Sequence, residues 1–361
     1  MNGIGPAGHD TPNDLAASDY VCPMRGTVRW LWAFAAFGAL FAMIGLVTGS
    51  VNLSLAEVWN ALLHPRADTA IGTIIWRVRL PEIATAAFAG AGLAAGGLLM
   101  QTLFRNPLAG PGVLGITSGS GLGVALVLLA RPLWSWMPLP QDLMMTVAAL
   151  LGAIAVLLLI VFADRRVGDG ITLLIMGLMV GYLCSALVSV LQAASGAEAL
   201  KGYVLWGMGS FGGMDLPRLP WIMIPVAAGL VVAITLIKPL NALLIGDDPA
   251  RSMGVPVDRV RRIAIWTTGV LAGTITAFCG PIAFLGLATP HVARAFLRTS
   301  DHRALMPGSI LLGAVLALGC DLLVRTSASG TLLPLNAVTS LLGAPVVLWV
   351  LLRGRKWARS A

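Results

Sequence analysis

The stretch RLPEIATAAFAGAGLAAGGLLMQTLFRNPLAGPGVLGITSGSGLG, residues 79–123, decides the fold class. Residues 83–104 carry no charge, and at about 1.5 Å per helical residue they are long enough to cross the roughly 30 Å hydrocarbon core of a bilayer. Arg105-Asn106-Pro107 then interrupts the helix, because proline lacks an N–H and clashes with the preceding turn. A second glycine-rich apolar segment follows. The stretch therefore predicts two membrane-spanning helices joined by a short loop.

Small residues spaced four apart occur in both of these spans. Gly92 and Gly96 form one pair, and Gly115, Gly119 and Gly123 repeat the spacing on the next span. In lipid, such spacing lets helix backbones approach closely, which predicts a tightly packed helical hairpin. The alternative is ordinary packing of membrane helices with no role in function.

The composition of the whole chain is that of a membrane protein. Hydrophobic residues make up 57% of it and charged residues only 11%, with a mean hydropathy of +0.87, beyond the range of soluble globular proteins. The four cysteines lack the spacing of a metal site or a disulfide framework, so we expect them to be packing residues. The fold class is therefore an all-α polytopic membrane protein.

Apolar segments are distributed over the whole chain, which indicates one membrane domain, residues 26–361. The preceding residues, 1–25, are rich in Gly, Pro, Asp and Asn and predict a disordered tail. Ten spans are predicted, at about 30–47, 83–104, 112–130, 143–163, 171–194, 221–239, 263–279, 281–297, 305–324 and 334–352.

The distribution of basic residues predicts the orientation. Most of the 24 lysines and arginines fall in segments that lie inside when the N-terminus is inside. Both termini are then cytoplasmic, as an even number of spans requires. The net charge of +8 is explained by this bias, so a nucleic-acid partner is not indicated.

Searches for catalytic motifs find no phosphate-binding loop, no zinc-protease motif, no nucleophile elbow and no dinucleotide fingerprint. The chain is therefore not expected to be an enzyme. Coupling to protons or sodium would need an acidic or histidine residue inside the membrane. Away from the span ends only His291 fits, and we expect a packed, hydrogen-bonded histidine. Asp321 lies near the outer end of the ninth span and could pair with Arg325.

The inner loop LLIGDDPARSMGVPVDRVRR, residues 243–262, has the pattern of two short helices. Asp248 suits an N-cap, Pro249 the first helical position, and Gly254 the C-terminal stop. Val255-Pro256 would then begin a second helix that continues into the seventh span. Such helices on the inner surface are what a soluble motor subunit could grip, and the alternative is a solvated basic loop.

Two arginines, Arg79 and Arg325, lie on the outer side, against the general bias of the basic residues. Each is next to the end of a span. They could extend to lipid headgroups, or they could present positive charge to an acidic partner outside.

Several ordered stretches together resemble the FecCD-type permeases, the membrane subunits of ABC importers for ferric siderophores, haem and cobalamin. The resemblance covers nearly everything from about Trp76 to Arg353. Its stretches are WRVRLPEIATAAFAGAGLAAGGLLMQTLFRNPLAGPGVLG, WGMGSFGGMD, GDDPARSMGV, GPIAFLGLATPHVARAFLRTSDHRALMPG and LPLNAVTSLLGAPVVLWVLL.

The resemblance implies a type II ABC importer permease in the bacterial inner membrane. It implies a homodimer of ten-helix subunits, two cytoplasmic ATPase subunits and an external, periplasmic or extracellular, substrate-binding protein. ATP and Mg²⁺ would bind to the partner subunits, so no cofactor or metal is expected in this chain. Closure of the ATPase pair would drive alternating access, importing an iron chelate (a ferric siderophore or haem). The alternatives are a cobalamin importer, a stand-alone secondary transporter, and a sensory or scaffold subunit.

The resemblance also implies roles for individual residues. The coupling loop, residues 241–262, would dock in a groove of the ATPase, and Arg79 and Arg325 would pair with carboxylates on the substrate-binding protein. Asn106 and Leu108, with Gly170 and Ile171, would form the inner gate, and Met176 and Met179 would line the path in the fifth span. The coupling residues would be Gly246, Asp247, Asp248, Ala250, Arg251, Met253, Gly254 and Val255.

Two positions depart from the family pattern. Many relatives have arginine where this chain has Glu82, which replaces an outer positive charge by a negative one. At the second gate position we would expect small hydroxyl residues, and Gly170-Ile171 supplies none. The stretch RNPLAGPGVLGITSG slightly favours a siderophore as cargo.

Overall fold

The computed structural model describes residues 24–357, except 50, 65–68, 131–133, 135, 168–169 and 327–332. The predicted tail therefore lies almost wholly outside the described residues, as does Cys22. Within the described part the chain is helical and contains no strand. Cys184, Cys279 and Cys320 are buried free thiols, which confirms their role in packing.

Every predicted span coincides with a helix, although some helices are short. The elements are α2 (Met24–Val47), α3 (Leu55–Leu63), α4 (Ala70–Thr73), η2 (Ile74–Arg79), α5 (Leu80–Leu103), η3 (Pro111–Leu114), α6 (Ile116–Leu129), α7 (Gln141–Val167), α8 (Gly170–Ala194), α9 (Ala197–Gly207), α10 (Leu219–Thr235), α11 (Ile237–Leu243), α12 (Asp247–Ser252), α13 (Val257–Cys279), α14 (Leu285–Leu297), α15 (His302–Arg325) and α16 (Leu335–Trp357).

Six of the described helices are long and apolar enough to cross a membrane on their own, or seven if α10 and α11, bent by 54°, count as one span. These findings confirm an all-α polytopic membrane protein. Helices α6 and α16 coincide with predicted spans but have shorter apolar segments, and α14 has only 13 residues. The count of ten therefore stays a prediction.

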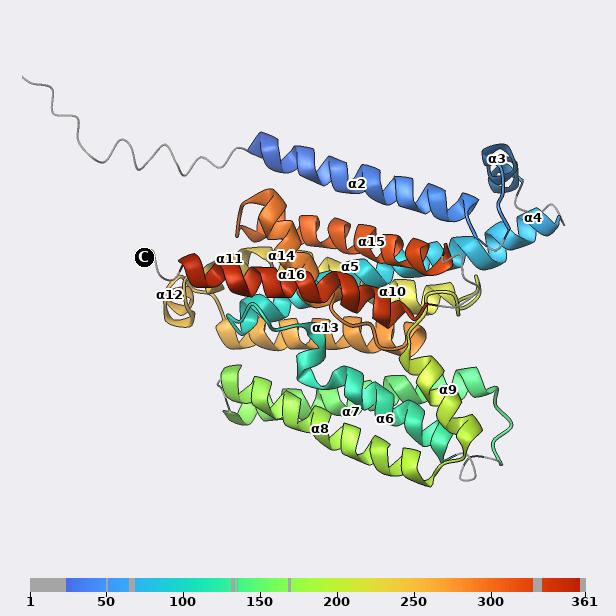
Figure 1. The fold of residues 1–361 in the computed structure, drawn as a ribbon. Helices are drawn as coiled ribbons and strands as arrows, with labels where there is room; N and C mark the ends of the chain where they lie inside the picture. The colour runs from blue at the N-terminus through green and yellow to red at the C-terminus, as the bar shows by residue number, and fades with distance from the viewer. Residues whose placement is uncertain are drawn as a thin grey trace, which may run out of the picture.

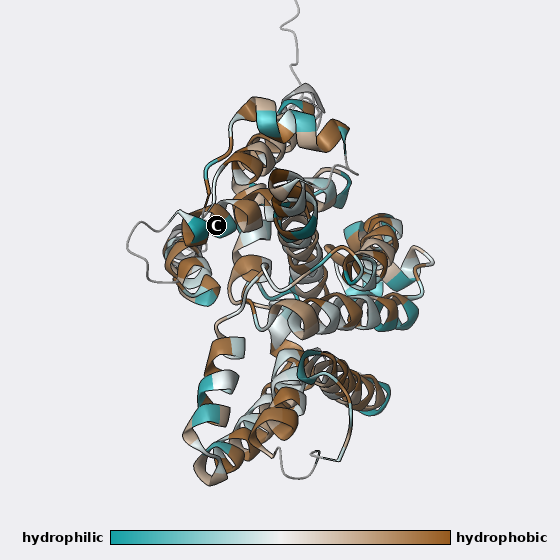
Figure 2. Ribbon diagram, turned by 90° about the vertical axis from the view of Figure 1, so that its right-hand side faces the viewer, coloured by the Kyte–Doolittle hydropathy of each residue, from teal (hydrophilic) through white to brown (hydrophobic). Residues whose placement is uncertain are grey.

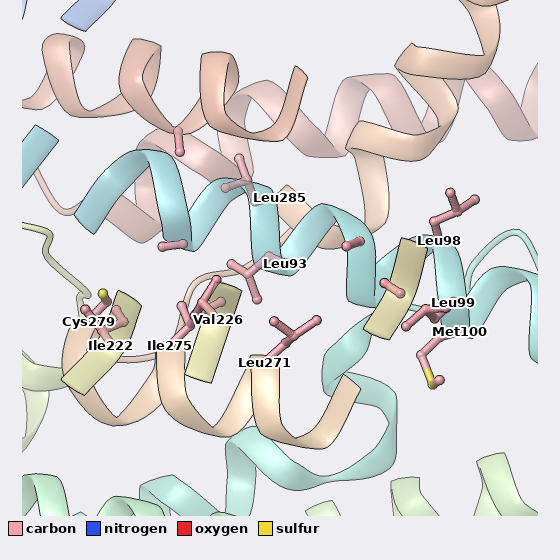
Figure 3. Close-up of a cluster of buried hydrophobic side chains, with 14 of the residues drawn as sticks. Leu93, Leu98, Leu99, Met100, Ile222, Val226, Leu271, Ile275, Cys279 and Leu285 are labelled. Atoms are coloured by element: carbon pink, nitrogen blue, oxygen red, sulfur yellow. The ribbon is translucent and has the colours of Figure 1, made fainter. Parts of the chain in front are cut away.

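Helix α5 occupies the centre of the bundle, with α10, α13, α14 and α15 packed around it (Figure 1). Its apolar side chains interlock with those of its neighbours, as Leu93 does with Leu271 and Ile275 of α13 (Figure 3). Small residues let these neighbours approach α5 from several sides, since Gly97 lies against the backbone of Gly286 in α14 and Gly92 lies against side chains of α10 and α13. The glycines of α5 therefore explain its central place.

Glycines permit the closest helix contact in this core. A Cβ at Gly90 of α5 would overlap the carbonyl group of Gly313 in α15, and a Cβ at Gly313 would overlap Gly90 in turn. Backbone therefore packs directly on backbone here, as expected of small residues in a membrane bundle.

The predicted hairpin between the second and third spans is wrong. Helix α6 packs on α7 and α8 rather than on α5, and its Gly119 meets Gly152 of α7 with backbone against backbone. The connection redirects the chain, because Arg105 and Gly115 both adopt positive φ, 44° and 76°. The glycine spacing thus indicated close packing correctly but not its partners.

The bundle has two ends that differ in their elements (Figure 1). Helix α12 lies at one end, together with the start of α2 and the end of α16, and we call this the α12 end. Helices α3, α4 and α9 lie at the other, which we call the α3 end. Apolar residues colour the outward faces of the helices as well as the interior (Figure 2), as expected of a protein surrounded by lipid.

Candidate functional site

The predicted short helix in the coupling loop exists as α12, but it begins two residues earlier than expected. Its N-cap is Gly246, with φ 143°, and no side chain caps it. Asp248 is therefore not the N-cap: Asp247 and Asp248 are the first helical residues. Both carboxylates still lie at the positive end of the helix, where negative charge is favourable.

The C-terminal end of α12 confirms the predicted stop at Gly254. This residue has φ 82°, and its N–H donates to the carbonyl of Arg251 at 2.9 Å. The N–H of Val255 donates to the carbonyl of Ala250 at 3.0 Å, which completes a Schellman motif. Pro256 then precedes α13, as the sequence predicts.

One side of α12 is buried against the bundle and another is exposed. Ala250 is fully buried, whereas Ile245 before the helix and Met253 after it are exposed. An ion pair of 3.0 Å between Arg251 and Asp258 joins α12 to α13. The coupling residues therefore form a fixed projection whose outer surface mixes apolar and charged side chains.

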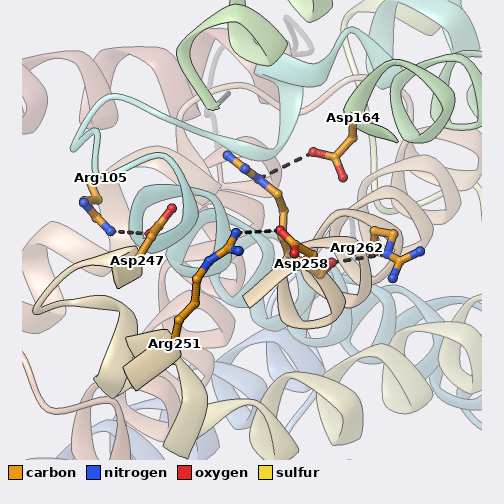
Figure 4. A network of polar contacts seen from close by, with 7 residues as sticks. Arg105, Asp164, Asp247, Arg251, Asp258 and Arg262 are labelled. Atoms are coloured by element: carbon orange, nitrogen blue, oxygen red, sulfur yellow. Dashed lines mark hydrogen bonds and ion pairs between the residues drawn. The ribbon is translucent and has the colours of Figure 1, made fainter. Parts of the chain in front are cut away.

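The first predicted gate residues lie in the loop that follows α5, residues 104–110, which we call the gate loop. Arg105 forms an ion pair with Asp247 of α12 (Figure 4). The side-chain oxygen of Asn106 accepts the N–H of Leu108 at 2.9 Å, an Asx turn that shapes the loop. The coupling helix and the gate loop are thus in direct contact.

His291 of α14 also holds the gate loop. Its Nε2 lies 2.7 Å from the carbonyl oxygen of Pro107, and because a carbonyl only accepts, Nε2 carries the donated proton. His291 is buried. The prediction of a packed, hydrogen-bonded histidine is confirmed.

The second pair of predicted gate residues starts α8. Ile171 is exposed. A Cβ at Gly170 would lie 3.4 Å from the ring of Phe104 in the gate loop and 2.8 Å from a guanidinium nitrogen of Arg261. Phe104 and Gly170 are 66 positions apart in sequence. The gate loop and the start of α8 therefore meet at the α12 end.

A buried ion pair at this end was not anticipated. Arg261 Nε of α13 lies 3.5 Å from Asp164 Oδ1 of α7, with only 9% and 7% of the two side chains exposed. The sequence contains a usable signal, because Asp164 continues the buried stripe of Ala153, Leu157 and Ile160 at helical spacing. A charge that continues a buried stripe predicts a paired partner inside the bundle.

The predicted path residues differ in their surroundings. Met179 is half exposed on α8, whereas Met176 is partly buried and packs against the core. Met179 therefore lies on the open face of α8, and Met176 connects that face to the interior.

At the α3 end, Arg79 is turned inward. Only 3% of the residue is exposed, and its guanidinium donates to the backbone carbonyls of Leu46 and Val51. The side chain does not extend to the surface, although contact with lipid headgroups or with an acidic partner protein would each require that. In this conformation Arg79 joins the end of α2 to the start of α5.

Arg325 is also occupied within the chain. Its Nη2 lies 3.0 Å from Glu82 Oε2 and 2.5 Å from Asp321 Oδ2. The pairing with Asp321 is the one the sequence predicts. Glu82, the departure from the family pattern, supplies the second carboxylate and joins α5 to α15.

The two pairs involve acidic residues at the ends of predicted spans, Asp164 after the span 143–163 and Asp321 near the outer end of the ninth span. Asp164 and Asp321 are both buried. Asp164 pairs with Arg261 of a different helix, α13, and Asp321 pairs with Arg325 one turn further along α15.

Comparison with known proteins decides the family. The model of the FecCD transport family matches residues 37–353, nearly the whole described bundle. The chain belongs to the FecCD transport family. This FecCD chain is accordingly a permease subunit of an ABC importer, as the sequence stretches implied.

Curated relatives extend the similarity over almost the full chain. It is 36% identical to the vitamin B12 import system permease protein BtuC of Klebsiella pneumoniae, over 92% of this chain and 96% of that protein. It is 34% identical to the protein of the same name from Salmonella typhi, over 92% and 97%. The spanning helices and these relatives indicate a multi-pass protein of the bacterial inner membrane.

A solved structure has the same fold. It is described as an inward-facing conformation of a transporter assigned to the metal-chelate ABC type. It matches with a TM-score of 0.77 and 31% identity, and the match covers 90% of this chain and 98% of that one. As a permease of an ABC importer, a FecCD chain works with ATPase subunits and a substrate-binding protein.

Proposed function

We propose that this FecCD permease carries a corrinoid of the cobalamin type across the inner membrane, driven by ATP hydrolysis in its partner subunits. The cargo assignment is supported by the name that the relatives share. They are vitamin B12 import permeases, 34–36% identical to this chain over more than nine-tenths of its length. The cobalamin alternative thus has better support than the iron chelate that the sequence stretches slightly favoured.

An iron chelate is the second candidate. It is favoured by the description of the solved structure as belonging to a metal-chelate type of transporter, at 31% identity. Cobalamin is itself a large chelate of a metal, so the two cargoes place similar demands on the width of a path. Transport measurements separate them.

The permease works as a homodimer with the open face of α8 at its axis. That helix exposes Ile175, Met179, Tyr182 and Leu183 along one side. An extended apolar surface of this kind is typical of an interface or of a lipid contact. We assign the part that contains Met179 to the path, where an unbranched, flexible side chain adapts to a passing cargo.

The α12 end faces the cytoplasm and receives the ATPase. Support comes from the excess of arginine and lysine in the segments at this end and from the projecting surface of α12. The start of α2 and the end of α16 lie at this end (Figure 1). The ATP and Mg²⁺ bind to the ATPase, and this chain contributes the docking residues from Gly246 to Val255.

Movement of α12 reaches the gate through contacts already in place. Asp247 pairs with Arg105 in the gate loop, and Asn106 shapes the turn that presents Leu108. When the ATPase subunits close, α12 shifts, the gate loop follows and the inner mouth closes while the outer mouth opens. Hydrolysis reverses the movement and releases cargo inward.

The α3 end receives the substrate-binding protein. Docking through Arg79 and Arg325 requires both side chains to leave the partners described above. We therefore infer that these residues act at the surface only in a conformation in which the α3 end is rearranged.

Uptake into vesicles that contain this permease, its ATPase and its binding protein tests the cargo. Labelled cobalamin, a ferric siderophore and haem are supplied separately, each with and without ATP. We expect ATP-dependent accumulation of cobalamin alone. Accumulation of the siderophore or haem, without cobalamin, would overturn the cargo and leave the permease assignment intact.

A further inference from the structure

We propose that the buried ion pair between Asp164 and Arg261 transmits the movement of α12 to the start of α8, so that Asp164 and Arg261 are positioning residues for the inner gate. The proposal rests on the function proposed above. It adds a second route beside the contact between Asp247 and Arg105.

The route begins at α12. Arg251 of α12 pairs with Asp258 in the first turn of α13 at 3.0 Å (Figure 4). Arg261 lies one turn further along the same helix. Only residues 253–256 separate α12 from α13, so a displacement of α12 also moves the first turn of α13, even when the exposed pair opens. Because a helix moves as a rigid rod over one turn, Arg261 moves with it.

Arg261 then contacts both sides of the short connection between α7 and α8. Its Nε is 3.5 Å from Asp164, three residues before the end of α7. Gly170 is the first residue of α8, and a Cβ on it would lie only 2.8 Å from a guanidinium nitrogen of Arg261. One side chain thus touches the end of one helix and the beginning of the next.

The burial of this pair makes the link stiff. The exposed pair of Arg105 and Asp247, with 49% and 48% of the side chains exposed, can open because water replaces each partner. Separation of Asp164 from Arg261 instead leaves a buried charge without its partner, which is strongly unfavourable. The buried pair therefore moves as a unit, and the exposed pair can break and re-form.

This arrangement also explains the missing hydroxyl residue at the second gate position. The space that a side chain at position 170 would occupy contains the Arg261 guanidinium. A side chain at position 170 would displace this guanidinium, and the polar group near the gate comes from α13 instead of α8.

The test uses the complete importer, with permease, ATPase and binding protein, in vesicles. The permease carries Arg261→Gln, Asp164→Asn, or both changes together, and uptake of the transported cargo and ATP hydrolysis are measured in the same vesicles. Arg165→Gln, which removes an exposed arginine next to Asp164, is the matched control. Thermal unfolding and co-purification of the ATPase are recorded for every variant.

The double variant is decisive, because it removes both charges and leaves no buried charge unpaired. We expect it to unfold near the temperature of the unmodified protein and to bind the ATPase. Its uptake per ATP hydrolysed should fall by about five-fold or more, in the range of coupling energies between sites. The Arg165→Gln control should keep the unmodified ratio.

A double variant that folds and keeps the unmodified ratio overturns the proposal, since a merely structural pair would recover once both charges are gone. If the double variant does not assemble, Gly170→Ala decides, because its Cβ displaces the Arg261 guanidinium while both charges remain. Reduced coupling in Gly170→Ala supports the proposal, and full coupling overturns it. An unmodified complex without ATP-driven uptake overturns the proposed function, and this inference with it.

Discussion

Asp247, the first residue of α12, forms an ion pair with Arg105, which lies in the gate loop 142 positions earlier in the chain. The pair joins the helix offered to the ATPase directly to the loop that contains the predicted gate residues Asn106 and Leu108. It is half exposed, so it is suited to a contact that forms and breaks during a transport cycle.

Removal of this pair should affect transport more than stability. Asp247→Asn or Arg105→Gln should change the free energy of unfolding by less than about 1 kcal/mol, as is usual for exposed ion pairs. Uptake per ATP should fall several-fold, because the gate loop no longer follows α12. Thermal unfolding and vesicle uptake measure the two effects. Unchanged uptake in both variants would contradict the assigned link.

The close contact between α5 and α15 predicts a large effect of one methyl group. Gly90→Ala places a Cβ against the backbone of Gly313, which forces the two helices apart and should destabilise the fold by about 1–3 kcal/mol. Gly202→Ala in α9 is the matched control, because its Cβ would have a neighbour only at 4.0 Å. The control should be neutral or stabilising by about 0.5–1 kcal/mol. Equal melting temperatures for the two variants would refute the contact.

Arg325 at the α3 end should be necessary for the stability of the fold. Arg325→Gln leaves Glu82 and Asp321 without the cation between them, so we expect a loss of about 3–5 kcal/mol and reduced amounts in the membrane. Adding Glu82→Gln should restore part of the loss, because it removes one of the two unpaired carboxylates. Expression level and thermal unfolding provide the readout. A stable Arg325→Gln protein that only loses binding-protein affinity would favour a docking role in the resting state.

Helix α3 should lose its N-terminal structure in acid. The N–H and hydroxyl of Ser54 donate to Glu57 at 2.7 and 2.8 Å, and the backbone bond above all lowers the pKa of Glu57 below its ordinary value of 4.5. A lowered pKa means that the stabilisation is present above pH 4.5 and is lost as the pH falls through the lowered value.

Hydrogen exchange of the α3 amides across this pH range checks the prediction. Protection should decrease in acid in the unmodified protein. Glu57→Gln should show no such decrease, because an amide does not titrate in this pH range. A decrease of the same size in Glu57→Gln would show that another group is responsible.

Much of the fold was predictable because hydropathy and chain breakers act locally. The uncharged residues 83–104 predicted a membrane-spanning helix, which is α5, and Gly254 predicted the end of α12, where it adopts a φ of 82°. Asp248 was misjudged as an N-cap because Gly246 takes that position with a φ of 143° that only glycine adopts readily.

Partners of helices and of charges were less predictable, because they depend on how distant segments meet. The glycines of residues 83–123 indicated close packing, yet Gly90 meets α15 and Gly119 meets α7. Asp164 and Arg261 are 97 positions apart in sequence by these numbers, and only the packing of α7 on α13 brings them together. Arg79 looked like an outward-facing charge until its carbonyl partners in and after α2 were known.

The most direct test of the account is whether transport through this permease follows ATP. Vesicles with the complete importer are compared under three conditions: ATP with no ion gradient, an ion gradient with no ATP, and neither. We predict accumulation of cargo only with ATP, and loss of that accumulation in the double variant of Asp164 and Arg261. Accumulation that follows the ion gradient and ignores ATP would contradict the account.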